Sequence, residues 1–293
     1  MGGSARDAFE ARWSEGDYGR KFALDKLAQY QAAGFDSPQF HADLNSGDEH
    51  QFFQQLWEMV LGCHLLDLGL AVHAPKGNAP DFLVEHEGQR IWVEAICPTP
   101  KGVPSEFVKP PPGVTGVIDW PNDPILLRWT HAIAEKRRKL ERYREKGVVQ
   151  PGDSYVIAVN GHWLGAVMDS EGISGWPWAA EATLAIGPIQ VKINRHTLEW
   201  GEFQNSARSR VINANNAQVE TDTFWSDHYV PVSAVLGTVK ASWERTPAPI
   251  CVVHNPKTDA PIPRWLFGED LDVTGTIDGD ELTATRTERP DGI

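Results

Sequence analysis

The order of elements predicted between residues 48 and 160 constrains the fold of this chain more than any other feature. Apolar residues recur at helical spacing from Phe53 to Leu68, and Gly69 is a typical residue to end that helix. The predicted order is helix, strand, hairpin, long loop, helix, strand. The main segments are a helix at 48–69, hairpin strands at 80–86 and 89–97, a Pro- and Gly-rich loop at 99–122, a helix at 124–146 and a strand at 154–160.

The rest of the chain differs in character from this central region, and its 293 residues allow one large domain or two small ones. Past residue 165, short β-like pieces at 182–187, 189–194, 232–242 and 249–255 alternate with turns. The last 25 residues hold eight acids and two arginines, and we expect this tail to be flexible. The predicted organisation is a helical segment at 1–45, a core at 46–165, a β-rich extension at 166–268 and an acidic tail at 269–293.

Composition excludes several classes of protein. A chain that is 41% hydrophobic and 23% charged is not wholly disordered. It has no apolar run approaching the roughly 20 residues that cross a bilayer, so we expect no membrane association. Its start lacks a hydrophobic signal segment, which favours the cytoplasm. Cys63, Cys97 and Cys251 stand far apart without a C-x-x-C pair, which indicates neither a disulfide framework nor a structural zinc.

The predicted hairpin places two carboxylates on one face. If Glu87 and Gly88 form a two-residue turn, Asp81 lies opposite Glu94, with Cβ atoms about 4.5–5.5 Å apart. Like charges at that distance repel each other unless a cation lies between them, and paired carboxylates suit magnesium or manganese. The opposite face is apolar: Phe82, Val84, Ile91, Val93 and Ala95.

A third acid comes from the preceding helix. Glu58 lies at the margin of its apolar stripe, beside Leu61 and Gly62. A helix packed on the hairpin would aim Glu58 at the same carboxylate pair. The alternative is an ordinary glutamate at the edge of a helix.

These residues resemble the motif of the PD-(D/E)XK nuclease superfamily. Pro80 and Asp81 precede one strand, Glu94 lies on the next, and the order αβββαβ over 48–160 is that of a restriction-endonuclease-like core with a mixed sheet, here of the α/β (α+β) class. The resemblance implies that Asp81 and Glu94 hold Mg²⁺ or Mn²⁺, assisted by a backbone carbonyl near Ala95. Glu58 matches the helical glutamate of several branches. The implied function is metal-dependent hydrolysis of nucleic acid, with DNA favoured.

One position departs from that family. Its lysine, two residues after the acid, is Ile96 here, and an isoleucine neither orients nor activates water. Either the lysine has moved to another element or the site does not cut. In the second case the chain is a degenerate nuclease fold that binds nucleic acid or protein as a scaffold subunit.

The helix at 124–146 offers two candidate replacements. Lys136 falls on its apolar stripe, three residues after Ile133 and four before Leu140. Lys139 with Tyr143 at i+4 is similar to the Q-x-x-x-Y signature of the exonuclease-like branch, with lysine in place of glutamine. The sequence leaves open a further interpretation of Lys136, in which its stem lies along the core and its ammonium ends in water.

Charge bears on the partner. The net charge is −13, yet residues 136–146 carry seven basic side chains and two acids. This composition argues against indiscriminate nucleic-acid binding and permits contact through a limited basic strip with strong salt dependence. The β-rich half is the expected surface for a homodimer or a protein partner. The chain has twelve tryptophans, which support a weaker alternative, carbohydrate binding by the β-rich half.

Overall fold

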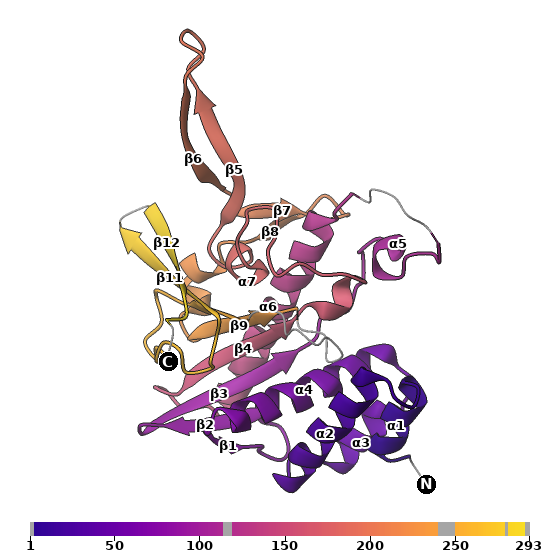
Figure 1. Cartoon of the computed structure of the whole chain (residues 1–293). Helices are drawn as coiled ribbons and strands as arrows, with labels where there is room; N and C mark the ends of the chain where they lie inside the picture. The colour runs from indigo at the N-terminus through magenta and orange to yellow at the C-terminus, as the bar shows by residue number, and fades with distance from the viewer. Residues whose placement is uncertain (1–2, 114–118, 240–249, 279–280, 291–293) are drawn as a thin grey trace.

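The computed structural model describes residues 3–113, 119–239, 250–278 and 281–290. Figure 1 shows a large mixed β-sheet with helices on both faces, in agreement with the predicted mixed α/β class. None of the helices within these ranges is both long enough and apolar enough to cross a bilayer.

The helices fall into two groups in the chain, α1–α4 before the first strand and α5–α7 after the hairpin. Four precede the first strand, and they confirm the predicted helical N-terminal segment and the helix expected at 48–69. The helices are α1 (Ala5–Arg12), α2 (Tyr18–Ala32), α3 (Pro38–Leu44), α4 (Glu49–Asp67), α5 (Ser105–Val108), α6 (Asn122–Glu145) and α7 (Trp178–Glu181), with short 3-10 turns η1 (His162–Leu164), η2 (Thr223–Trp225) and η3 (Asp227–Tyr229).

The large sheet has the strand order β1-β2-β3-β4-β9-β10-β11-β12. The pairs β3–β4, β4–β9 and β10–β11 are parallel, and the other neighbours are antiparallel. Its strands are β1 (Ala71–His73), β2 (Phe82–His86), β3 (Gln89–Ile96), β4 (Ser154–Asn160), β9 (Ala234–Thr238), β10 (Cys251–His254), β11 (Leu271–Asp278) and β12 (Glu281–Glu288). Two small hairpins are separate from it, β5 (Ile186–Ile193) with β6 (Trp200–Ala207), and β7 (Arg210–Ile212) with β8 (Gln218–Glu220).

The β2–β3 hairpin has the predicted register. His86 pairs with Gln89 and Phe82 pairs with Val93 across the ladder. Glu87 and Gly88 have φ angles of 48° and 81°, the left-handed values that a two-residue type I′ turn requires. The ladder ends at Phe82, so Asp81 lies one residue before the strand.

The two faces of the sheet build two cores. The face predicted to be apolar, including Phe82, Val93 and Ala95, packs against α1–α4. Trp92 and Ile96 point to the other face, where α6 and α7 cover the sheet. Each helical layer can therefore present side chains to the hairpin from its own side.

Two predictions about the second half need correction. The prediction that residues 269–293 form a flexible tail is wrong where this segment forms strands. β11 and β12 extend the large sheet, and Asp272 is fully buried there. The predicted extension at 166–268 does contain strands, but β9 and β10 belong to the central sheet. The sequence concealed this because β9 pairs in parallel with β4, across more than 70 intervening residues.

Individual segments also differ from prediction. Ala182–Ala185 lies between α7 and β5, and the strand begins only at Ile186. Within the predicted piece at 232–242, the strand is β9, and residues 240–242 lie outside the described part of the chain. Part of the predicted loop, at 114–118, lies outside it as well.

Candidate functional site

A large cleft lies between the α4 layer and α6, at the end of the hairpin where Asp81 is found. Its volume is about 1160 Å³. Four of the five predicted site residues line it, and the fifth, Glu94, is fully buried directly behind the lysines. The lining includes Gln54, Glu58, Asp81, Ile96, Lys101, Arg128, His131, Lys136, Lys139 and the β7–β8 turn residues Asn213–Asn215.

Glu94 is the centre of a buried polar cluster. Lys136 Nζ lies 2.8 Å and Lys139 Nζ 2.6 Å from the same Glu94 oxygen, Oε1. The Tyr143 hydroxyl donates to the other oxygen, Oε2, at 3.1 Å. These three donors lie on successive turns of α6, which places them on one helix face above the strand. The interpretation in which the Lys136 ammonium ends in water is therefore wrong, because it ends on Glu94.

Asp81 and Gln54 bind the backbone of β3 where the ladder to β2 has ended. Asp81 Oδ2 accepts a hydrogen bond of 2.7 Å from the Ala95 amide. Gln54 donates to the Ala95 carbonyl at 3.1 Å and accepts from the Cys97 amide at 2.8 Å. Two side chains thus satisfy the backbone groups of β3 that no longer face β2, and they fix Asp81 at the cleft wall.

Glu58 reaches the cleft because α4 packs closely on the hairpin. One turn after Glu58, a Cβ added to Gly62 would lie 2.8 Å from Phe82 Cζ, so only glycine permits this approach. Glu58 Oε1 accepts a hydrogen bond of 2.9 Å from Gln54 Nε2. Glu58 and Asp81 therefore line the same cleft.

Burial and the neighbouring charges shift the pKa values of the cleft acids and lysines. Burial raises the pKa of Asp81 well above its usual range, and the Glu94 and Glu58 carboxylates raise it further. Burial also raises the pKa of Glu58. For Lys136 and Lys139, burial acts to lower the pKa, but the Glu94 and Asp81 carboxylates outweigh it and raise the pKa of both. With every group ionised the cluster holds one excess negative charge.

No family model, curated protein or solved structure matches this chain. The chemistry of the cleft therefore has to be inferred from its own residues.

Sequence reasoning missed two residues of the cleft. Gln54 links α4 to β3, and its signal was the i,i+4 spacing to Glu58. Arg128 lies on the same face of α6 as Lys136 and Lys139, at helical spacings of 8 and 11 residues. Its guanidinium is held by Thr99, through Nε to the carbonyl at 2.7 Å and a terminal nitrogen to the hydroxyl at 3.2 Å. Arg128 is thus a positioned cation in the cleft.

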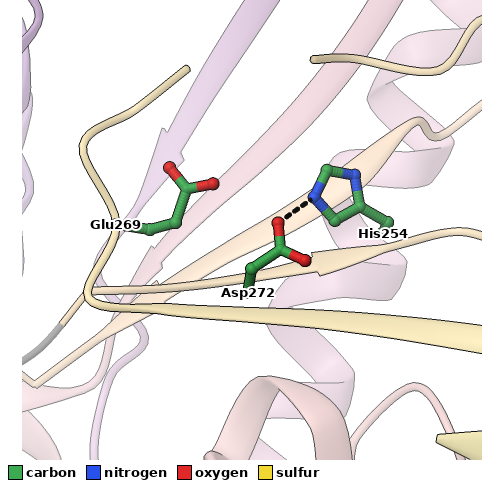
Figure 2. Close-up of side chains that lie close together, drawn as sticks. All are labelled: His254, Glu269 and Asp272. Carbon is green, nitrogen blue, oxygen red and sulfur yellow. Dashed lines mark hydrogen bonds and ion pairs between the residues drawn. The ribbon is translucent and has the colours of Figure 1, made fainter. Parts of the chain in front are cut away.

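A second cluster of ligand-type side chains lies at β10 and β11, which β4 and β9 separate from β3 in the sheet (Figure 2). His254, Glu269 and Asp272 have ligand atoms within 4.8 Å of one another, the only such group of three in the described residues. The predicted set of Asp81, Glu94 and Glu58 is not gathered to that extent.

The atoms of this second cluster are already bound by the protein. Asp272 accepts hydrogen bonds of 2.8 Å from His254 Nε2 and from Arg264 Nε. Glu269 accepts from the amides of Trp265 and Phe267, at 2.6 and 3.1 Å. These hydrogen bonds hold the loop before β11 against the sheet. They explain why Glu269 and Asp272, two acids of the predicted tail, are buried.

Proposed function

We propose that this chain is a Mg²⁺- or Mn²⁺-dependent nuclease that hydrolyses phosphodiester bonds of nucleic acid, with DNA as the favoured substrate and a PD-(D/E)XK-like core. The observation that carries the proposal is the convergence of Asp81, Glu58, Lys136 and Lys139 on one cleft, with Glu94 beneath them. The order α4, β1, β2, β3, α6, β4, interrupted only by the four-residue α5 before α6, supports it, since it matches the αβββαβ order of that superfamily.

The donor set fits a hard divalent cation in its chemistry. Asp81 and Glu58 offer carboxylate oxygens at the cleft wall, which is the ligand type that Mg²⁺ and Mn²⁺ prefer. Burial is the main cause of the raised pKa of both acids, and for Asp81 the Glu94 and Glu58 carboxylates add a repulsion that a cation would relieve. Asp81 and Glu58 would hold the ion, and Glu94 would join them if one lysine leaves its oxygen.

The cations of the cleft have proposed roles in the reaction. When bound, the ion supplies a water of lowered pKa and offsets charge on the phosphate. Lys136 or Lys139 orients that water or neutralises the scissile phosphate, in place of the lysine that Ile96 replaces. Arg128 binds a neighbouring phosphate, since its guanidinium is positioned by Thr99. In the overall reaction the water oxygen bonds to phosphorus, the bond from phosphorus to the leaving oxygen breaks, and the proton that the water gives up balances the one that the leaving oxygen takes up.

A second candidate function is favoured by a specific observation. Glu94 already receives two ammonium groups and a hydroxyl, so its charge is compensated without a metal. Together with Ile96, this supports a degenerate nuclease fold that binds nucleic acid or a protein as a scaffold and does not cut.

Cleavage assays separate the two candidates. Supercoiled plasmid, linear duplex, single-stranded DNA and RNA are incubated with Mg²⁺ or Mn²⁺. The nuclease proposal predicts cleavage by the wild type and a loss of about 100-fold or more in Asp81→Asn. Glu85→Gln, at an exposed acid on the same hairpin, is the matched control and should cut normally. Absence of cleavage on every substrate, with intact folding, would favour the scaffold.

A further inference from the structure

The β5–β6 hairpin stands away from the body of the molecule as an arm (Figure 1). Within the sheets of the described residues, β5 and β6 pair only with each other. An isolated two-stranded hairpin is at best marginally stable in water and gains stability when its apolar face is covered. An arm of eight-residue strands therefore calls for a partner surface.

The two faces of the arm are chemically different. Val191 pairs with Phe203 and Ile193 pairs with Trp200, and paired residues of an antiparallel ladder share a face. The Trp200 and Phe203 rings lie 6.1 Å apart, which confirms that they share it. The other face is polar, with Gln190, Lys192, Glu202 and Gln204.

The apolar face is open to solvent. Trp200 and Phe203 are 66% and 67% exposed, and Ile189 and Ile193 are 59% and 47% exposed. Large apolar side chains scattered singly on a surface need no explanation, but a contiguous patch marks an interaction site.

The base of the arm is fixed to the body. Asn205 donates to the carbonyls of Ser174 and Gly187, at 3.0 and 2.9 Å. Its side-chain oxygen accepts from Trp176 Nε1 at 2.9 Å. The apolar face is therefore presented in a defined direction, so little ordering entropy remains to be lost on binding.

We propose that this arm is a dimerisation element, and that its apolar face packs against the same face of a second copy of the chain. Each copy offers on the order of 500 Å² of exposed side-chain surface, so that a pair would bury about 1,000 Å², the lower limit of a specific interface. A two-fold axis through the patch makes every apolar contact twice.

Charge argues for a second copy over nucleic acid. The arm from Ile189 to Asn205 carries Lys192 and Arg195 on its first half and Glu199 and Glu202 on its second. Phosphate binding requires a surplus of Lys and Arg, which the arm lacks. The two basic and two acidic side chains of the arm balance each other, so no net charge repulsion opposes the approach of a second copy.

Sedimentation velocity tests the proposal over protein concentrations from about 1 to about 100 µM. The wild type should approach twice 32.5 kDa as concentration rises. The double variant Trp200→Glu/Phe203→Glu should weaken dimerisation by at least about tenfold. Val167→Glu, at a valine that is 75% exposed elsewhere, is the matched control and should dimerise like the wild type.

A wild type that stays monomeric over this range overturns the proposal, as does a folded double variant that still dimerises. Hydrogen exchange of the wild type supplies a readout that requires no substitution, so misfolding of a variant cannot affect it. Amides of residues 186–207 should become more protected as concentration rises, and unchanged protection would contradict the proposal. These readouts do not depend on nuclease activity, so the two proposals can fail separately.

Discussion

Lys136 Nζ lies 2.8 Å from Glu94 Oε1, although the two residues are 42 positions apart and lie on different layers of the fold. Both side chains are buried, with Glu94 0% and Lys136 7% exposed. Helix α6 thus delivers to the acidic strand residue the positive charge that Ile96 does not provide. Lys139 reaches the same oxygen from the cleft side, where it is partly exposed.

Removing Lys136 should destabilise the protein more than removing Lys139. Lys136→Met leaves the buried Glu94 with the partly exposed Lys139 as its single ammonium partner, and we expect a loss of about 3 kcal/mol in the free energy of unfolding. Lys139→Met should cost about 1 kcal/mol, because Lys139 is partly exposed and Lys136 remains in place. Urea unfolding measures both. Equal effects would contradict the buried pairing.

Asp81 gives a pH-dependent prediction for the metal-free protein. Its pKa in the fold is raised, so the folded state holds a proton that the unfolded chain releases as pH rises above about 3.9. Stability therefore falls as pH rises from that value through the raised pKa. Asp81→Asn removes this loss and should be more stable than the wild type at pH 7, with the difference shrinking at low pH. Thermal unfolding between about pH 3 and pH 8 measures it, and a pH-independent difference would contradict it.

Arg128 should contribute to binding nucleic acid and much less to folding. Arg128→Met is expected to weaken binding about tenfold and to reduce the salt slope by about 1. Fluorescence anisotropy with labelled DNA, without divalent metal, measures both quantities. Arg138→Met is the matched control, since Arg138 is an exposed arginine of the same helix and does not line the cleft. Equal losses in the two variants would refute a specific role for Arg128.

Asp272 should act as a structural residue. Asp272→Asn disturbs bonds to His254 and Arg264 at a fully buried position, and we expect a loss of about 2–3 kcal/mol in stability. Glu288→Gln, at an exposed acid of β12, should have little effect. In an Asp81→Asn background, which removes the ion proposed for the cleft, chelation by EDTA should not change the melting temperature. If EDTA lowers the melting temperature in that background and no longer does so once Asp272→Asn is added, the cluster is a metal site instead.

The sequence predicted those parts of the fold and cleft that depend on local pattern. The turn at Glu87 and Gly88 predicted the register of the hairpin, and alternation along 82–86 and 89–96 predicted its apolar face. Helical spacing placed Lys136 on the inner face of α6. Both inferences rest on contacts or periods within a few residues, where side-chain direction follows directly from backbone geometry.

The remaining features depend on contacts between distant segments. Parallel pairing of β4 with β9 has no turn to signal it, so the extent of the large sheet was hidden. Asp272 looked like part of a solvated acidic tail because its partner His254 lies on another strand. Gln54 and Arg128 became visible as cleft residues only once α4 and α6 were packed against the sheet.

Mn²⁺ binding followed by electron paramagnetic resonance tests the central claim most directly, because it does not require the right substrate. The nuclease account predicts that the wild type binds Mn²⁺ and that Asp81→Asn lowers the affinity by about tenfold or more. Glu85→Gln should bind as the wild type does. A wild type that leaves the Mn²⁺ signal unchanged, or an Asp81→Asn variant that binds equally well, would contradict the account.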